Sequence, residues 1–133
     1  ALCASQWHKT LSYTDAFFKD GMTYDADFKK AFGYAPPYQA AESSAALLVF
    51  KDAFERANDF NTKKVRNALA KTDMQTFYGN IKFAKGGQNV SKPMVLFQVI
   101  CNSDGSKCEN KVVAPTKWAS AKLVHPTPSW SKR

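Results

Sequence analysis

The segment Tyr38–Ala57, with the sequence YQAAESSAALLVFKDAFERA, decides the fold class of this 133-residue chain. Its apolar residues recur every three or four positions, and Pro37 just before it suits the start of a helix. The segment therefore predicts a long amphipathic helix with small residues that allow close packing. The positions expected on its buried face are Ala46, Val49, Phe50, Ala53, Phe54 and Ala57, together with Ala41 and Ala45.

Shorter elements flank this helix on both sides. Residues 2–6 are apolar enough for a strand, and the aromatic-rich stretch that follows has no clean period and is expected to be a loop. Thr23 is predicted to cap a helix that ends at Gly33. Residues 62–71 predict a further helix, and residues 76–79 and 81–83 alternate as strands do. This order indicates a mixed α/β unit.

Two cysteines bracket a short polar loop near the end of the chain. Strand-like runs at residues 93–100 and 110–114 lead into and out of the loop, which predicts a β-hairpin. Cys101 and Cys108 would then face each other across the ladder at a distance that suits a disulfide. We therefore predict a Cys101–Cys108 bridge; two free thiols in a reducing compartment are the alternative. Cys3 is left over and is expected to be a small buried hydrophobe.

Composition narrows the class of protein. The chain has 44% hydrophobic and 23% charged residues, which is typical of one globular domain. The longest uncharged apolar-rich run, residues 43–50, is far shorter than the roughly 20 residues of a membrane span. The formal net charge of +8 comes from Lys and Arg scattered along the chain, so a nucleic-acid-binding role is not expected. The start lacks an initiator Met, and we expect a mature or truncated product.

No catalytic motif is present in the sequence. The two histidines, His8 and His125, have no partners at the spacing of a metal site or a catalytic triad. Gly86-Gly87 is a lone diglycine in a predicted turn and is a weak signal for phosphate binding. We therefore expect no enzyme activity, no metal and no cofactor, and a role in binding.

An ordered set of short motifs resembles the C-terminal part of one family of binding proteins. This family is the branched-chain amino acid (Leu/Ile/Val-binding) type of ABC transporter substrate-binding protein, with the periplasmic-binding fold of type 1. The resemblance covers essentially the whole chain. Its motifs lie at residues 34–42, 76–83, 87–90, 92–94, 98–99, 113–115, 118–119, 121–123 and 125–130.

The resemblance implies a two-lobed α/β protein that closes on a small ligand without changing it chemically. Residues 1–133 would be a single partial unit, with helices packed on a sheet plus a C-terminal β-hairpin, and would contain pieces of both lobes. Residues 2–5 and 94–114 would belong to the second lobe, and the helices beginning at Tyr38 and Thr62 would pack on the first.

The resemblance also implies where the ligand would be contacted. Trp7 follows the first strand, and Tyr38, Gln39 and Glu42 open the long helix, in stretches that match cleft-facing parts of the family. Aromatic faces can wall a ligand, Gln39 can donate and accept hydrogen bonds, and helix N-terminal amides favour an anion. Structural alternatives stand beside this interpretation: Trp7 and Tyr38 as packed aromatic residues, and Glu42 as a structural or solvated residue.

The function implied is that of an extracytoplasmic solute-binding component of an ABC importer, with a membrane permease as partner. The ligand would be an amino acid or a similar small carboxylate, and a disulfide would fit an oxidising compartment. The alternatives are a ligand-sensing receptor of the same fold and a basic nucleic-acid-binding module. A partial chain would also expose surfaces that missing partners normally cover, unless it self-associates.

Overall fold

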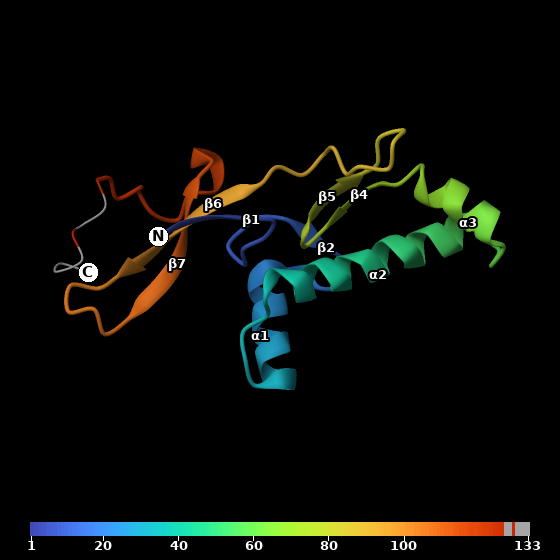
Figure 1. Ribbon diagram of the computed structural model, residues 1–133. Coiled ribbons are helices and arrows are strands. Elements are labelled where there is room, and N and C mark those ends of the chain that lie inside the picture. Colours follow the sequence, from blue (N-terminus) through green and yellow to red (C-terminus); the bar gives the residue numbers. More distant parts are fainter. Residues whose placement is uncertain (127–128, 130–133) are drawn as a thin grey trace.

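The computed structural model describes residues 1–126 and 129 of the chain. Strands β6 (Val95–Cys101) and β7 (Cys108–Ala114) form the predicted hairpin, and a Cys101–Cys108 disulfide confirms the predicted bridge. Strand β1 (Leu2–Ser5) pairs antiparallel with the other edge of β6, so the sheet has the order β1-β6-β7. The first and the last strands along the chain thus lie in one sheet (Figure 1).

A short ribbon and a helix follow β1. Strands β2 (Thr14–Asp15) and β3 (Lys19–Asp20) pair, and helix α1 (Gly21–Phe32) begins directly after them. The predicted cap was wrong: the N-cap is Asp20, whose carboxylate accepts the Thr23 N–H at 2.7 Å. The first helical residue, Gly21, lies against the backbone of Lys9, where a Cβ would come within 2.6 Å of the carbonyl oxygen, so this position requires glycine. The predicted end at Gly33 is confirmed by its left-handed φ of 80°.

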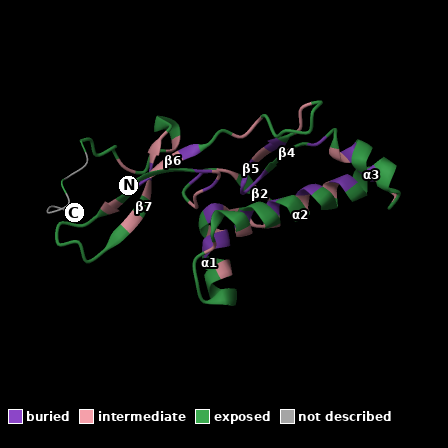
Figure 2. Ribbon diagram, in the orientation of Figure 1, coloured by how far each residue is buried: buried purple, intermediate pink, exposed green. Residues whose placement is uncertain are grey.

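Helix α2 (Tyr38–Ala57) has the predicted bounds, but the predicted buried face is only partly right. The buried residues follow one another at intervals of four positions and form what we call the inner row: Ala41, Ala45, Val49 and Ala53. The neighbouring positions Ala46, Phe50 and Phe54, the outer row, were predicted to be buried and are exposed. The reason is that α3 and the β4–β5 hairpin leave a cavity beside Ala46 and Phe50. Buried and exposed segments therefore alternate along α2 (Figure 2).

The last helix and a second hairpin complete this part of the fold. Helix α3 (Thr62–Leu69) is capped by Asn61, whose side chain accepts the N–H groups of Lys63 and Lys64. Strands β4 (Asp73–Thr76) and β5 (Gly79–Lys82) form a tight hairpin, so the predicted strand at residues 76–79 is in fact the turn. The Thr76 hydroxyl causes this turn, because it donates to the Gly79 carbonyl at 2.9 Å and accepts the Gly79 N–H.

An aromatic cluster around Phe77 forms the centre of the core. The Phe77 side chain is fully buried, and its ring lies 4.3 Å from that of Tyr24, 5.0 Å from that of Phe18 and 6.1 Å from that of Trp7. Val95 and Val112 extend this core into the sheet. The region made of β1, β6 and β7, which we call the sheet region, therefore shares one core with the helical region made of α1 to α3 and β2 to β5.

Cys3 departs from its prediction as a buried residue and is exposed. It lies on β1, an edge strand of which only Ser5 is buried. The last element is the short 3₁₀ helix η1 (Thr116–Trp118), whose Trp118 ring lies 5.5 Å from the Tyr13 ring. No helix among the described residues is long and apolar enough to cross a membrane.

Candidate functional site: a cavity between the sheet and helix α2

Three of the four predicted site residues line the same cavity. Trp7, Tyr38 and Gln39 border a hollow of about 530 Å³ between the sheet and the start of α2. Residues 5 and 7–10 form one wall, residues 35–39 form another, and the sheet contributes Phe97 and residues 109–111. Segments far apart in the sequence therefore meet around this space. Glu42, the fourth predicted residue, does not line it.

Trp7 is held from both sides at this wall. The Ser5 hydroxyl donates to the Trp7 carbonyl at 2.9 Å and accepts the Trp7 N–H at 3.3 Å, which fixes the backbone where β1 ends. The indole packs edge-on against Tyr24 and Phe77 and is 6% exposed. Its Nε1 finds no hydrogen-bond acceptor among the described residues. Most of the Trp7 side chain thus belongs to the core, and only part of it borders the cavity.

The start of helix α2 presents polar groups to the same cavity. Pro37 is the N-cap residue and provides no side-chain hydrogen bond to the first turn. The first N–H groups of a helix lack intrahelical acceptors and carry a partial positive charge. Tyr38 is 40% exposed and Gln39 is exposed, so both side chains are accessible beside these amides. The arrangement favours a carboxylate or another small anion.

Charged groups of both signs line the cavity. Lys9 pairs with the largely buried Asp25 at 3.1 Å, and on β7 Lys111 pairs with Glu109 at 2.5 Å. Hydrogen bonds from Lys111 and from Lys107 lower the pKa of Glu109 to about 2, so this group is a carboxylate at neutral pH. Burial lowers the pKa of His8 below its usual value, which keeps this imidazole neutral at pH 7. Both carboxylates of the cavity are therefore paired with lysines, two for each carboxylate.

Glu42 borders a different cavity. This second cavity, of about 660 Å³, lies between α2, α3 and the β4–β5 hairpin, and Gln6, Tyr78 and Lys92 also border it. The Lys92 ammonium lies 4.1 Å from the centroid of the Tyr78 ring and donates to the Gln6 carbonyl. Glu42 is exposed.

Several cavity residues were not found by sequence reasoning. Lys9, Glu109 and Lys111 approach the predicted aromatic residues from distant parts of the chain, and their local sequences form no motif. The only local signal was the charge alternation of residues 107–111, which is equally typical of an exposed hairpin. Among residues 1–126 and 129, no group of three or more His, Cys, Asp or Glu side chains is placed to hold a metal ion.

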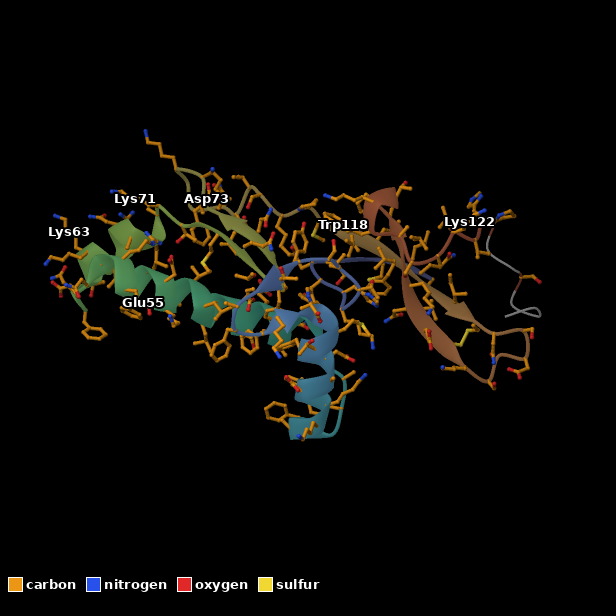
Figure 3. The ribbon with its side chains drawn as sticks, turned by 180° about the vertical axis from the view of Figure 1, so that it is seen from behind. Glu55, Lys63, Lys71, Asp73, Trp118 and Lys122 are labelled. Carbon is orange, nitrogen blue, oxygen red and sulfur yellow. A yellow bond between two sulfur atoms is a disulfide. The ribbon has the colours of Figure 1, made fainter. Side chains whose placement is uncertain are left out.

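The lysines on α3 and near the end of the chain do not gather into one basic patch. Lys63 on α3 and Lys122 beyond η1 lie at opposite ends of the molecule (Figure 3). Other lysines are engaged with carboxylates, as in the pairs Lys51–Glu55 and Lys64–Asp59. This distribution agrees with the scattered charge expected from the sequence.

Comparison with known proteins identifies a relationship over most of the chain. The sequence profile of a family described as "Periplasmic binding protein" matches residues 5–106. Among solved structures, the leucine-binding protein LivK of Thermotoga maritima superposes with a TM-score of 0.65 over 87% of this chain, at 22% sequence identity. The superposition covers 31% of the LivK chain, so these 133 residues span less than a third of that structure. Residues 127–128 and 130 of the sequence motif at 125–130 lie outside the described residues.

Proposed function

This chain belongs to the periplasmic binding protein family, and from this premise we propose that it is part of an extracytoplasmic solute-binding component of an ABC importer. The proposed ligand is an amino acid or a similar small carboxylate. The observation that carries the proposal is the cavity of about 530 Å³, because its walls come from both the sheet region and the start of α2. A ligand in that position would touch both regions at once.

The chemistry of the cavity supports this class of ligand. The amide end of α2 offers partial positive charge to a carboxylate, and Gln39 can donate a further hydrogen bond beside it. The two carboxylates of the cavity, Asp25 and Glu109, are each already paired with two lysines, so the cavity favours the carboxylate end of the ligand over an ammonium group. The rings of Trp7 and Tyr38 provide apolar surface for a side chain. The structurally similar LivK is a leucine-binding protein, which supports the same class of ligand.

The disulfide supports an oxidising compartment. Bridges such as Cys101–Cys108 persist in secreted and periplasmic proteins and are rare where thiols are kept reduced. A location outside the cytoplasm is also where an importer's binding component meets its ligand. The proposed partner is a membrane permease, which would receive the ligand from the closed protein.

The proposal is tested by ligand-dependent stabilisation of the full-length protein. Leucine, valine, phenylalanine and acetate are each added in a thermal-shift screen, followed by titration calorimetry of any that stabilise. A ligand at 100 times its Kd is expected to raise the free energy of unfolding by about 2.7 kcal/mol. If none of these compounds at millimolar concentration changes the unfolding temperature, the proposed ligand class is wrong.

Variants at the cavity locate the binding site. Gln39→Ala is expected to weaken binding about tenfold, because it removes a hydrogen bond worth about 1 kcal/mol or more. Gln75→Ala is the matched control, because this residue is also exposed and bonds to Thr14 away from the cavity. Equal affinities for Gln39→Ala and the unaltered protein would place the ligand elsewhere.

A further inference from the structure

Two connecting segments join the sheet region to the helical region. Residues 6–13 lead from β1 to β2, and residues 83–94 lead from β5 back to β6 (Figure 1). Any change in the angle between the two regions must pass through these segments. Contacts between the segments therefore help to hold the wall that residues 5 and 7–10 form in the cavity of about 530 Å³, which we call the ligand cavity.

Lys92 on the second segment reaches the first one. Its Nζ donates to the carbonyl oxygen of Gln6, the residue just before Trp7. Gln6 and Lys92 border the second cavity, whereas Ser5 and residues 7–10 border the ligand cavity. Lys92 therefore contacts the segment that forms one wall of the cavity of about 530 Å³ without lining that cavity itself.

The position of the Lys92 side chain is fixed by the β4–β5 turn. The ammonium lies over the ring of Tyr78, which is 5% exposed, and the aliphatic stem crosses Gly79. A Cβ at Gly79 would come within 2.6 Å of the Cδ and Cε atoms of Lys92. The absence of a side chain at Gly79 thus opens the path along which Lys92 reaches Gln6.

We propose that Lys92 is a positioning residue that holds the two connecting segments together and so fixes the wall at residues 5–10 of the ligand cavity. It acts through the Gln6–Trp7 peptide and does not touch the ligand itself. Only the consequence for ligand affinity rests on the proposed function. The contact itself can be tested on the protein without ligand.

The electrostatic surroundings of Lys92 give this contact a pH dependence. Burial lowers the pKa of Lys92 to about 8, and Glu42 on α2 opposes this effect at longer range. Burial also raises the pKa of Tyr78, so the phenol stays neutral, with Glu42 and Tyr38 adding to the effect. The other charged groups that border this cavity are Arg66 and Lys85, both cations. No described carboxylate forms an ion pair with Lys92.

The sign of the pH dependence follows from these surroundings. When the segments separate, Lys92 enters water and its pKa returns toward the ordinary 10.5. The open state then binds the proton more tightly than the closed state. Closure is therefore favoured as pH rises between about 8 and 10.5, by up to about tenfold per pH unit.

Hydrogen exchange of the full-length protein, read by mass spectrometry, tests the proposal. The measurement is made at pH 9, where Lys92 of the closed state is largely neutral and its hydrogen bond to Gln6 carries less of the cost of a buried charge. Lys92→Ala is then expected to raise exchange in residues 5–10 at least about tenfold, with α3 and the β6–β7 hairpin unchanged, since about 1.4 kcal/mol of lost contact has that effect. Lys85→Ala is the matched control, because Lys85 borders the same cavity and has no contact with Gln6. Unchanged exchange in residues 5–10, or an equal rise in every segment, would overturn the proposal.

A pH series gives a second readout that does not depend on a destabilising variant. After correction for intrinsic exchange, protection of residues 5–10 in the unaltered protein is expected to rise between pH 8 and 10. Lys92→Met keeps the stem over Gly79 and has no titrating group, so its protection is expected to stay level. A level profile in the unaltered protein, or the same slope in Lys92→Met, contradicts the assignment. If the proposed function also holds, Lys92→Ala weakens ligand binding while Lys85→Ala does not.

Discussion

The sheet region and the helical region cover their apolar side chains to different degrees. In the sheet, exposed apolar residues such as Leu2 and Val99 are scattered over different strands, and the hairpin is closed by a disulfide. On α2, the outer row continues into the next loop, with ring centroids 6.2 Å apart for Phe50 and Phe54 and 5.4 Å apart for Phe54 and Phe60. Contiguous exposed aromatic surface of this kind marks a contact that something else completes.

This difference explains why α2 is apolar on two sides. A helix covered on one side has a single apolar stripe, whereas a helix between two layers carries a wider one. The inner row is buried where α3 and β4 contact α2, whereas the outer row stays exposed. Ala46 and Phe50 border the second cavity, and the Phe54 ring contacts the rings of Phe50 and Phe60. The chain matches 31% of the LivK structure, and an exposed apolar row of this length is typical of a surface that a further element or another molecule covers.

The largest loss of stability on mutation is expected where the two regions share one core. Phe77→Ala removes the ring at the centre of the aromatic cluster, and we expect it to lower the free energy of unfolding by about 4 kcal/mol. Urea denaturation followed by tryptophan fluorescence measures this change. Phe60→Ala is the control at an 86% exposed ring, with an expected change within about 0.5 kcal/mol. Similar losses for both variants would contradict the shared core.

The second largest loss of stability is expected on removal of the disulfide, and it should be confined to the sheet region. Replacing both Cys101 and Cys108 by Ser opens a loop of sequence separation 7, which costs about 2 kcal/mol in the chain-entropy description. Hydrogen exchange is expected to rise at the β6–β7 tip and to stay unchanged in α2 and α3. Cys3→Ser, at the exposed free thiol, serves as the control and should change stability by less than about 0.5 kcal/mol. Faster exchange in α2 would mean that the hairpin also supports the helices.

The bounds of α2 and the end of α1 could be predicted because they depend on local chemistry, whereas the start of α1 and the β4–β5 turn could not. The spacing of apolar residues and the proline before Tyr38 were sufficient for α2, and Gly33 was sufficient for the end of α1. The disulfide followed from a short polar loop between two strand-like runs. The face of α2 that is buried could not be predicted, because the choice between two apolar rows depends on which elements pack against the helix.

The sequence predicted the aromatic and amide residues that line the candidate site but not its charged residues. Trp7, Tyr38 and Gln39 were identified through a family resemblance and lie around one cavity. The ionic groups opposite them, such as Glu109 and Lys111 on β7, depend on strand pairing between distant segments. Lys92 was missed for the same reason, since its contact with Gln6 joins residues separated by 86 positions.

A third, smaller loss of stability is expected on mutation of Asp25 on α1, and it should depend on pH. Although burial raises the pKa of Asp25, hydrogen bonds from Lys29 and Lys9 outweigh it and hold the pKa below the usual 3.8. The ionised carboxylate therefore stabilises the fold above pH 4, and this contribution is lost as pH falls through the lowered pKa. Asp25→Asn is expected to cost about 1 kcal/mol at pH 7 and nothing at the lowest pH where the protein still folds.

The control for this carboxylate is its neighbour on the same helix. Asp27 is exposed and forms no ion pair among those found in the described residues. Asp27→Asn should change stability by less than about 0.5 kcal/mol across the same pH range. Equal losses for the two variants would mean that the charge of α1, and not the pairing of Asp25, is responsible.

The smallest effect of mutation on stability is expected at the outer row. Its contiguous exposed apolar surface is also the feature in which the helical region differs most from the sheet region. Phe50→Ser combined with Phe54→Ser removes apolar surface that is already exposed, so the free energy of unfolding of this chain should change by less than about 1 kcal/mol. Fluorescence of a bound apolar dye, and any self-association seen by sedimentation, should fall. Leu2→Ser combined with Val99→Ser removes side chains of similar exposure from the sheet and should leave both signals unchanged, because isolated apolar residues do not form a binding surface. An equal loss of dye binding in both variants would show that the two regions do not differ in this respect.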